Sequence, residues 1–418
     1  MKVLLIGSGA REHALGWKLV QSDHVSELIS LPGNPGLAEL GAVIEGVDPT
    51  DVGAVAALAR VHAIDFVVVG PEAPLAAGVV DALSHVGIPA FGPTRAAARL
   101  ESSKSFAKEI MNRAGVPTPA AWTFQHAADA EQHIRSHPGP YVVKADGLAG
   151  GKGVLVTGDR DEAIAWAHRC LSDDLGGADP RVVIEEYAAG PELSVFAICD
   201  GTNSLLLEPA RDYKRIGVGD TGPNTGGMGS YSPVDLPSDL LEQVERTVIQ
   251  PVLETMRSDG EPYVGVLYAG LVLTDGGPKV IEFNCRLGDP ETQVVLARLE
   301  SDLFETLRAA TTGELADANL SWSPDSFVNV VLAAHGYPDN PRKGDVISGL
   351  ADNTGLVFHA GTTRDGKHLR TSGGRVMSVL GRGHDLATAR QAAYAAAETI
   401  TFKGKTLRSD IAAGASID

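Results

Sequence analysis

The residues best suited to chemistry lie in the run Val280–Glu291, where acidic, amide and basic side chains accompany a predicted strand. On a strand, Glu282 and Asn284 point to the same face. Two oxygen ligands on one face can share a Mg²⁺ ion that also takes phosphate oxygens. Arg286 can reach the same side and suits a carboxylate through paired hydrogen bonds, whereas Cys285 faces the other way and is expected to be buried. A solvated strand face is the alternative.

A second candidate is the glycine-rich loop Lys144–Gly153, which lies between two predicted strands. It is not a P-loop, because Asp146 stands at the position of the leading glycine and Gly153 replaces the Ser/Thr. Its backbone N–H groups suit a flap that covers phosphates, and Lys144 adds a fixed positive charge. A plain hairpin loop is the alternative, although such a loop rarely carries two lysines among so many glycines.

The segment Gly7–His13 follows a predicted strand and opens a helix. Glu12 stands at the third glycine of the dinucleotide fingerprint, so NAD is not expected. A phosphate-bearing ligand at the helix N-terminus, assisted by Arg11, is the preferred interpretation, and a turn without a ligand is the alternative.

Two further segments place polar residues where a ligand can use them. Glu185–Ala188 ends a predicted strand and Glu192 follows a Gly-Pro turn. Backbone groups there can pair with an adenine edge and a carboxylate can hold ribose hydroxyls, although an acidic strand end is the simpler explanation. Asp212–Gly229 predicts a long loop without periodicity, which is usually functional inside a compact domain; a disordered insertion is the alternative.

Short apolar runs alternate with helical patterns over the first hundred residues, which is typical of a parallel sheet covered by helices. Gly and Pro residues at 115–119 end a predicted helix, and longer alternating strands follow a small α/β unit. The strands are expected over 3–6, 28–31, 66–69, 89–91, 141–145, 154–156, 182–186, 193–199, 205–209, 266–273, 279–283, 328–333 and 376–379, and the helices over 51–62, 76–86, 104–114, 161–171, 240–257 and 386–400.

Composition limits the classes of function. The chain has 418 residues with 35 basic and 53 acidic side chains, and the net charge of −18 argues against a nucleic-acid binder. Small anionic ligands remain possible, because local loops reverse the field. Three cysteines fit a reducing cytoplasm, and neither a signal peptide nor a membrane span is expected.

The motifs together resemble the phosphoribosylamine–glycine ligase (glycinamide ribonucleotide synthetase) family of the ATP-grasp superfamily, over nearly the whole chain. The matching segments are Gly7–His13, Gly70–Leu75, Lys144–Gly153, Asp212–Gly229, Glu282–Glu291, Arg342–Asp345 and Phe358–Thr362. The resemblance implies an α/β architecture: a parallel-sheet N-terminal domain at 1–101, a two-lobed ATP-grasp domain at 102–312 whose mobile lobe is 118–190, a linker at 313–325 and a C-terminal α+β domain at 326–418.

The resemblance also implies the reaction and its site. ATP, glycine and 5-phosphoribosylamine would give glycinamide ribonucleotide, ADP and phosphate through glycyl phosphate, in purine biosynthesis. The residues implied for catalysis and glycine are Arg286, Lys144, Asp212 and Lys214. Those implied for ATP are Lys104, Lys144, Gly147, Gly150, Gly151, Lys152, Gly153, Glu185, Glu186, Tyr187, Ala188 and Glu192. Those implied for phosphoribosylamine are Gly9, Arg11, Glu12, His13, Asn34, Gly36 and Glu72, and Glu282 and Asn284 would hold Mg²⁺ or Mn²⁺.

One departure from the family pattern lies beside the implied glycine residues. The family usually has Gln-Asp-His/Phe-Lys-Arg where this chain reads Arg-Asp-Tyr-Lys-Arg at 211–215. On a strand Arg211 and Asp212 point to opposite faces, so Arg211 is expected to lie outside the site.

Two other functions stay open: another ATP-grasp enzyme, such as a carboxylase that uses bicarbonate or formate, and a nucleotide-binding protein without catalysis. The expected partners are small molecules, with no nucleic acid or membrane, and the expected state is a cytoplasmic monomer.

Overall fold

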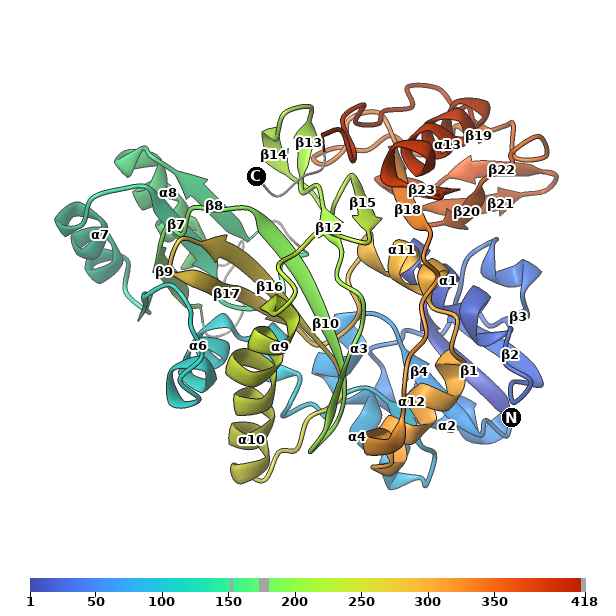
Figure 1. The fold of residues 1–418 in the computed structure, drawn as a ribbon, viewed down its shortest axis with the longest axis horizontal. Coiled ribbons are helices and arrows are strands. Elements are labelled where there is room, and N and C mark those ends of the chain that lie inside the picture. The colour runs from blue at the N-terminus through green and yellow to red at the C-terminus, as the bar shows by residue number, and fades with distance from the viewer. Residues whose placement is uncertain (151–152, 173–179, 415–418) are drawn as a thin grey trace.

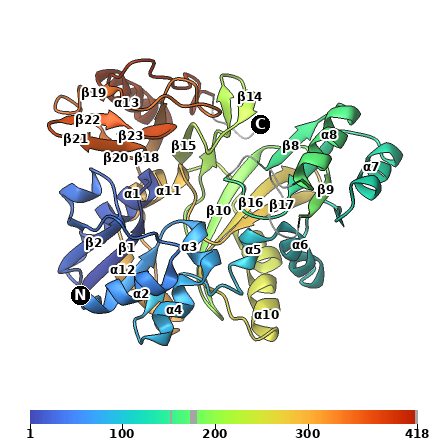
Figure 2. The same ribbon diagram turned by 180° about the vertical axis from the view of Figure 1, so that it is seen from behind.

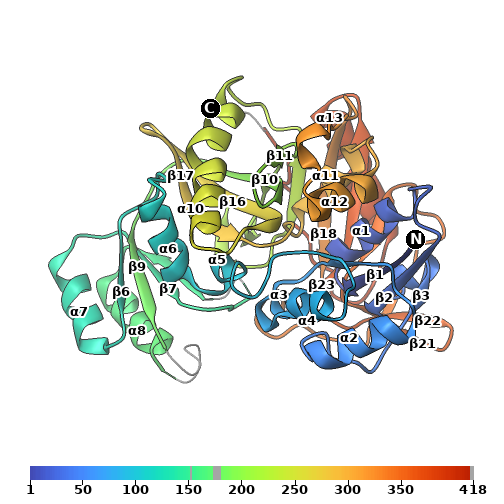
Figure 3. The same ribbon diagram turned by 90° about the horizontal axis from the view of Figure 1, so that it is seen from below.

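The computed structural model describes residues 1–150, 153–172 and 180–414. Figure 1 shows the N-terminal and C-terminal units on one side, a central sheet, and a lobe that stands away from both units. Seen from below, the lobe and the N-terminal unit lie at opposite ends of the molecule (Figure 3). None of the helices in the described ranges is long and apolar enough to cross a membrane.

The N-terminal unit is a parallel sheet in the strand order β3-β2-β1-β4-β5, as the alternating pattern predicts. Both faces are covered, which explains the continuous apolar runs of its strands. The helix predicted over 76–86 is divided, because Gly78 takes a left-handed φ of 94° between two helices. The elements are β1 Lys2–Gly7, α1 Ala10–Leu19, β2 Glu27–Pro32, β3 Ala42–Val43, α2 Val52–Val61, β4 Phe66–Val69, α3 Glu72–Ala77, α4 Val79–His85 and β5 Ala90–Phe91.

A central antiparallel sheet in the order β11-β10-β16-β17 carries the residues of the strongest sequence motif. The helix predicted over 240–257 is interrupted by a π-helical turn at Glu245–Ile249, next to Pro251, which has no amide N–H to donate. The strand predicted over 205–209 is shorter, at Ser204–Leu206. The elements are α5 Arg99–Ser102, α6 Lys104–Arg113, β10 Glu192–Asp200, β11 Ser204–Leu206, α9 Leu240–Val244, α10 Gln250–Ser258, β16 Val264–Thr274, β17 Gly277–Asn284, α11 Glu291–Arg298 and α12 Leu303–Thr312.

The lobe, residues 121–186, is an antiparallel sheet in the order β6-β9-β7-β8 with two helices and its own apolar core. Strands β7 and β8 pair directly, so the glycine-rich loop joins two neighbouring strands as predicted. The elements are β6 Ala121–Phe124, α7 Ala127–Ser136, β7 Tyr141–Ala145, β8 Val154–Thr157, α8 Arg160–Cys170 and β9 Val182–Glu186.

The segment predicted as a long loop, Asp212–Gly229, is about half strand, so this prediction was wrong in part. It contains the hairpin of β13 (Arg215–Gly217) and β14 (Thr221–Asn224), flanked by β12 (Arg211–Asp212) and β15 (Gly229–Ser232). Strand β15 pairs with β18 of the C-terminal unit, about a hundred residues later, so no local pattern reveals it.

The C-terminal unit therefore shares a sheet with the chain before it, in the order β12-β15-β18-β23-β20. Behind this sheet packs α13, and a smaller sheet, β19-β22-β21, lies beside it (Figure 2). The predicted linker 313–325 holds a 3-10 turn at Leu315–Asp317 and a bridge from Trp322 to Leu299. The elements are β18 Ser326–Ala333, β19 Val346–Ile347, β20 Leu356–His359, β21 Thr362–Asp365, β22 His368–Thr371, β23 Arg375–Gly383 and α13 Leu386–Thr399.

A buried histidine pair joins the N-terminal and C-terminal units. The backbone N–H of His359 donates to His13 Nδ1 at 2.8 Å, so His13 must be unprotonated there. Asn34 Nδ2 donates to the carbonyl of His359 at 2.8 Å. Burial lowers the pKa of His13 to about 3, with a further contribution from His359, and burial lowers the pKa of His359 to about 4. Both rings are therefore neutral at pH 7.

This contact predicts a specific acid sensitivity. The unfolded chain takes up a proton on each ring below about pH 6.5, while the folded protein does so only near pH 3–4. The contribution of these neutral rings to the free energy of unfolding is thus fully present above about pH 6.5. It decreases as the pH falls, by about 2 kcal/mol for one ring at pH 5. In urea unfolding at pH 7 and pH 5, His13→Asn should lose about 2 kcal/mol less than the wild type between these two conditions. An equal loss in both proteins would contradict this account, and His62→Asn, at an exposed position, is the control.

Candidate active site

A cavity of about 420 Å³ lies where the lobe, the central sheet and the segment 212–226 meet. It brings together most of the residues implied for catalysis, ATP and metal. The described residues of that set that line it are Lys104, Lys144, Gly147, Gly150, Gly153, Glu185, Glu186, Tyr187, Ala188, Glu192, Asp212, Lys214, Glu282, Asn284 and Arg286. The remaining two, Gly151 and Lys152, lie outside the described residues.

Two buried lysines hold one buried carboxylate on the lobe side of the cavity. Lys144 Nζ lies 3.0 Å from Glu185 Oε1, and Lys108 Nζ lies 3.3 Å from Glu185 Oε2. Burial lowers the pKa of Lys108 to about 8, although Glu185 opposes this. Both oxygens of Glu185 are therefore engaged by lysines, and Glu186–Ala188 line the cavity beside it. Sequence reasoning missed Lys108, although it stands one helical turn after Lys104.

The residue that excludes a P-loop has a structural task. Asp146 sits at the N-terminus of α6, where its Oδ1 accepts the backbone N–H of Lys104 at 2.5 Å. Lys104 Nζ in turn donates to the carbonyl of Gly147 at 2.9 Å. Burial lowers the pKa of Lys104, while Glu282 raises it. The first residues of the glycine-rich loop are therefore fixed to the helix that supplies the cation beneath it.

Side-chain oxygens of β17 lie beside cations on one face of its C-terminal end, as the alternation of side chains along a strand predicts. Glu282 Oε1 lies 3.7 Å from Lys214 Nζ, which also lies 2.6 Å from Glu192 Oε2. Arg286 Nη2 donates to Asn284 Oδ1 at 3.3 Å. Burial raises the pKa of Glu282, but Lys214 and the other cations outweigh it and lower that pKa. Glu282 is therefore an anion that faces the cavity, with one of its oxygens near Lys214. Cys285 is buried, as expected.

Arg286 is held by two carboxylates from the N-terminal part of the chain. Its Nε lies 3.3 Å from Glu72 Oε2, and its Nη2 lies 3.0 Å from Glu101 Oε1. Glu101 also accepts the backbone N–H of Cys285 at 2.7 Å. Sequence reasoning missed Glu101, because nothing in its surroundings indicates a partner 185 residues later.

Two buried carboxyl groups face the cavity from different elements. Burial raises the pKa of Asp212 to about 8, Lys214 lowers it, and Glu291 raises it further. Glu291 accepts the hydroxyl of Ser194 at 2.9 Å, and burial raises its pKa too. Glu291 was not among the predicted site residues. Arg211, next to Asp212, does not line the cavity, in agreement with the expectation that it lies outside the site.

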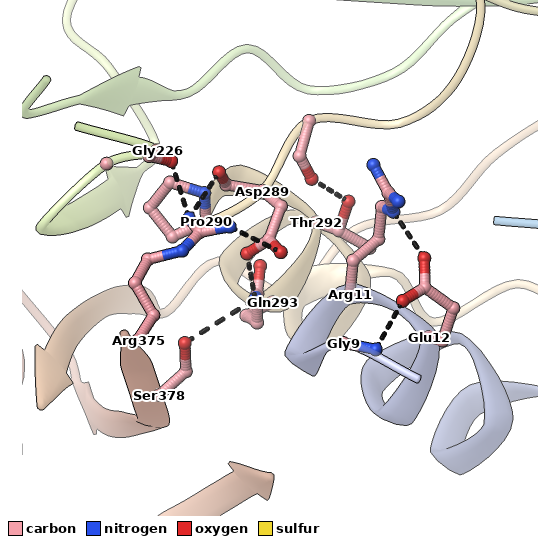
Figure 4. Close-up of polar contacts among 12 residues, drawn as sticks. Gly9, Arg11, Glu12, Gly226, Asp289, Pro290, Thr292, Gln293, Arg375 and Ser378 are labelled. Atoms are coloured by element: carbon pink, nitrogen blue, oxygen red, sulfur yellow. Dashed lines mark hydrogen bonds and ion pairs between the residues drawn. The ribbon is translucent and has the colours of Figure 1, made fainter. Parts of the chain in front are cut away.

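An arginine of the C-terminal unit closes another side of the cavity and was also missed. Arg375 donates to the carbonyls of Gly226 and Asp289, at 2.5 and 2.7 Å, and to Asp289 Oδ2 at 2.9 Å (Figure 4). Gln293 Nε2 holds the other oxygen of Asp289 at 2.9 Å. Three parts of the chain that are remote in sequence are thereby fixed to one another.

The residues implied for phosphoribosylamine are only partly gathered. Arg11 and Glu72 line the cavity, whereas Gly9, Glu12, His13, Asn34 and Gly36 do not. The carboxylate of Glu12 accepts the backbone N–H of Gly9 and the Nε of Arg11, each at 2.6 Å (Figure 4). A Cβ on Gly36 would lie 2.1 Å from the His13 ring, so glycine there lets the histidine reach its partner on β20.

Comparisons with known proteins agree along the whole chain. Family models of phosphoribosylglycinamide synthetase match as the N domain at residues 1–101, the ATP-grasp (A) domain at 102–292 and the C domain at 327–414. The phosphoribosylamine–glycine ligase of Streptomyces coelicolor is 50% identical over 100% of both chains, and that of Ralstonia nicotianae is 49% identical over 98% of both.

A solved structure agrees as well. The crystal structure of phosphoribosylamine–glycine ligase from Thermotoga maritima has a TM-score of 0.87 and 36% identity, with 98% of this chain and 100% of that chain covered. On these matches and on the three-part architecture around one cavity, the chain belongs to the phosphoribosylamine–glycine ligase family of ATP-grasp enzymes.

Proposed function

We propose that this chain ligates glycine to 5-phosphoribosylamine at the expense of ATP, giving glycinamide ribonucleotide, ADP and phosphate. The meeting of lysines with oxygen donors across one cavity supports this activity most directly, together with the full-length match to the family. We expect the enzyme to act as a cytoplasmic monomer.

The lobe side of the cavity suits ATP. The backbone at Glu186–Ala188 faces the cavity and offers hydrogen bonds to an adenine edge, and Glu192 is placed for ribose hydroxyls. Lys104 and Lys144 neutralise phosphate oxygens. Phosphoryl transfer needs positioning and charge neutralisation more than covalent chemistry, and these two cations are fixed before ATP arrives.

Glycine is proposed to lie between the two sides of the site. Arg286 and Lys214 hold its carboxylate, which attacks the γ-phosphorus, so that glycyl phosphate forms and ADP leaves. Asp212 receives the ammonium group. The bond between carbonyl carbon and phosphate oxygen breaks when the amine of phosphoribosylamine attacks, and phosphate is released. Acyl phosphates hydrolyse in water. The glycine-rich loop, which covers the phosphates of ATP, therefore also shields the glycyl phosphate from water.

Arg11 and Glu72 are the residues that reach the cavity from the N-terminal unit. We propose that they contact phosphoribosylamine, and that Gly9, Glu12, His13, Asn34 and Gly36 shape the wall behind them.

A divalent cation fits the donor set on β17. Glu282 and Asn284 offer a carboxylate and an amide oxygen on one side of the strand, and Mg²⁺ commonly takes one or two protein ligands and completes its shell with phosphates and water. When bound, the ion would neutralise charge on the transferred phosphoryl group.

The reaction itself is the first prediction of this assignment. Purified protein should release phosphate only when ATP, Mg²⁺, glycine and phosphoribosylamine are all present. Omitting each component in turn is the measurement. A carboxylase would instead turn over with bicarbonate or formate in place of glycine, and a binding protein would retain ATP without releasing ADP; either result would refute the assignment.

The carboxylate of Glu282 should be the more important metal ligand. Glu282→Ala should lower kcat/KM about a hundredfold, roughly 2.7 kcal/mol, because a preorganised charged group is lost. Asn284→Ala should cost less, because no charge is removed. Steady-state rates at limiting Mg²⁺ are the measurement, and wild-type activity of Glu282→Ala under those conditions would exclude this role.

Two adjacent residues of β12 should differ sharply in their effect on glycine. Asp212→Asn should raise the KM for glycine at least tenfold and leave that for ATP nearly unchanged, because an amide cannot ionise to pair with the ammonium group. Arg211→Gln, its matched neighbour outside the cavity, should change the glycine KM by less than about threefold, or about 0.7 kcal/mol. A tenfold change in the glycine KM of Arg211→Gln would show that Arg211, and not Asp212, faces the glycine site.

A further inference from the structure

The C-terminal segment 404–414 leaves α13 and packs against the β13–β14 hairpin (Figure 1). Its central residue, Arg408, has the largest fully buried side chain of the described residues, with only 1% exposed. A buried guanidinium is costly unless its donors are satisfied, and here every contact that satisfies them lies on the segment or on the hairpin.

The contacts of Arg408 hold strand β13 and the turn of the hairpin. Its Nη1 lies 2.7 Å from Asp220 Oδ1 and donates to the carbonyl of Arg215 at 3.0 Å. Its Nε and Nη2 donate to the two carboxylate oxygens of Asp410, at 2.8 and 2.7 Å. Asp410 in turn accepts the backbone N–H of Gly219 at 2.9 Å. Asp220 has a left-handed φ of 52°, a strained turn that these bonds hold in place.

Tyr213 adds a second attachment at the root of the hairpin. The guanidinium carbon of Arg408 lies 4.9 Å from the centre of its ring, and its hydroxyl accepts the backbone N–H of Ala412 at 2.9 Å.

The cavity end of the same hairpin carries Lys214. Thr225 binds this residue through two hydrogen bonds: its backbone N–H and its hydroxyl both donate to the carbonyl of Lys214, at 2.7 and 2.8 Å. Both residues line the cavity, and Lys214 Nζ bridges Glu192 and Glu282. Arg408 thus holds the backbone of Arg215, which is the next residue after Lys214, and Thr225 holds the carbonyl of Lys214 itself.

We propose that Arg408 is a positioning residue of the reaction: it holds the β13–β14 hairpin on the C-terminal segment and thereby sets Lys214 in the glycine subsite. The assignment of that subsite rests on the proposed function. Arg408 lies outside the cavity, so its effect reaches the substrate only through the hairpin.

The chain supplies a matched control in Arg390 on α13. Arg390 anchors the same segment through its backbone, with bonds to the carbonyls of Ile411 and Ser409 at 2.9 and 2.6 Å, and it stacks on Tyr394 at 4.7 Å. Its hydrogen bonds reach the segment but not the hairpin. If substitution only weakens the packing of the segment 404–414, both arginine variants should be affected. If it displaces the hairpin that carries Lys214, only the Arg408 variant should be affected.

The experiment compares Arg408→Met, Arg408→Lys and Arg390→Met in the full-length protein. Arg408→Met should raise the glycine KM at least tenfold and leave the ATP KM within twofold, because the ATP residues lie mainly on the lobe. Arg408→Lys keeps the charge and should rescue part of this loss. Arg390→Met should leave both constants within twofold. If Arg408→Met is insoluble, Asp220→Gly removes one acceptor of Arg408 from an exposed position while it tolerates the left-handed φ, and it must raise the glycine KM at least threefold.

Hydrogen exchange of the amides at 217–224, measured without substrates, should be at least tenfold faster in Arg408→Met than in the wild type or Arg390→Met. This measurement separates the positioning role of Arg408 from the proposed function. It tests whether Arg408 holds the hairpin even if the wild type shows no glycine-dependent phosphate release. Equal glycine KM values in the two Met variants, a joint rise of the glycine and ATP constants, or unchanged exchange would each overturn the role of Arg408.

Discussion

The site depends on keeping many charged side chains ionised inside a space from which water is largely removed. A lysine or carboxylate buried alone would lose its charge, because desolvation costs several kcal/mol. Most cations of the cavity are therefore matched to an acid: Lys108 and Lys144 to Glu185, Lys214 to Glu192 and Glu282, Arg286 to Glu72 and Glu101. Lys104 is held by the carbonyl of Gly147 instead.

This constraint explains why the cavity draws on all parts of the chain. The acids that match these cations lie on other elements than the cations themselves. Glu72 and Glu101 reach Arg286 from the N-terminal part, and Arg375 reaches Asp289 from the C-terminal unit. The sheet that joins β15 to β18 makes this possible, since it fixes the segment 211–232 to the C-terminal unit and to the cavity at once.

The same geometry decides how much the sequence could reveal. The end of β17 and the glycine-rich loop were predictable, because alternation along one strand and a loop between two neighbours are local properties. Lys108 carried a local signal as well, one helical turn after Lys104. Arg375 and Arg408 carried none, because their positions depend on strand pairings across the chain. The strands within Asp212–Gly229 were missed for that reason too, since short polar strands lack an apolar pattern until their partners are known.

The balance of charges in the cavity has a consequence for the nucleotide. Acidic side chains outnumber basic ones among the residues that line it, and the cations are already paired with them. A triphosphate brought to such a site would meet repulsion as well as attraction. A divalent cation on the proposed ligands Glu282 and Asn284 would relieve this repulsion when it arrives with the nucleotide. In the proposed assignment, the arrangement of the carboxylates therefore favours a nucleotide that carries a metal ion over one that does not.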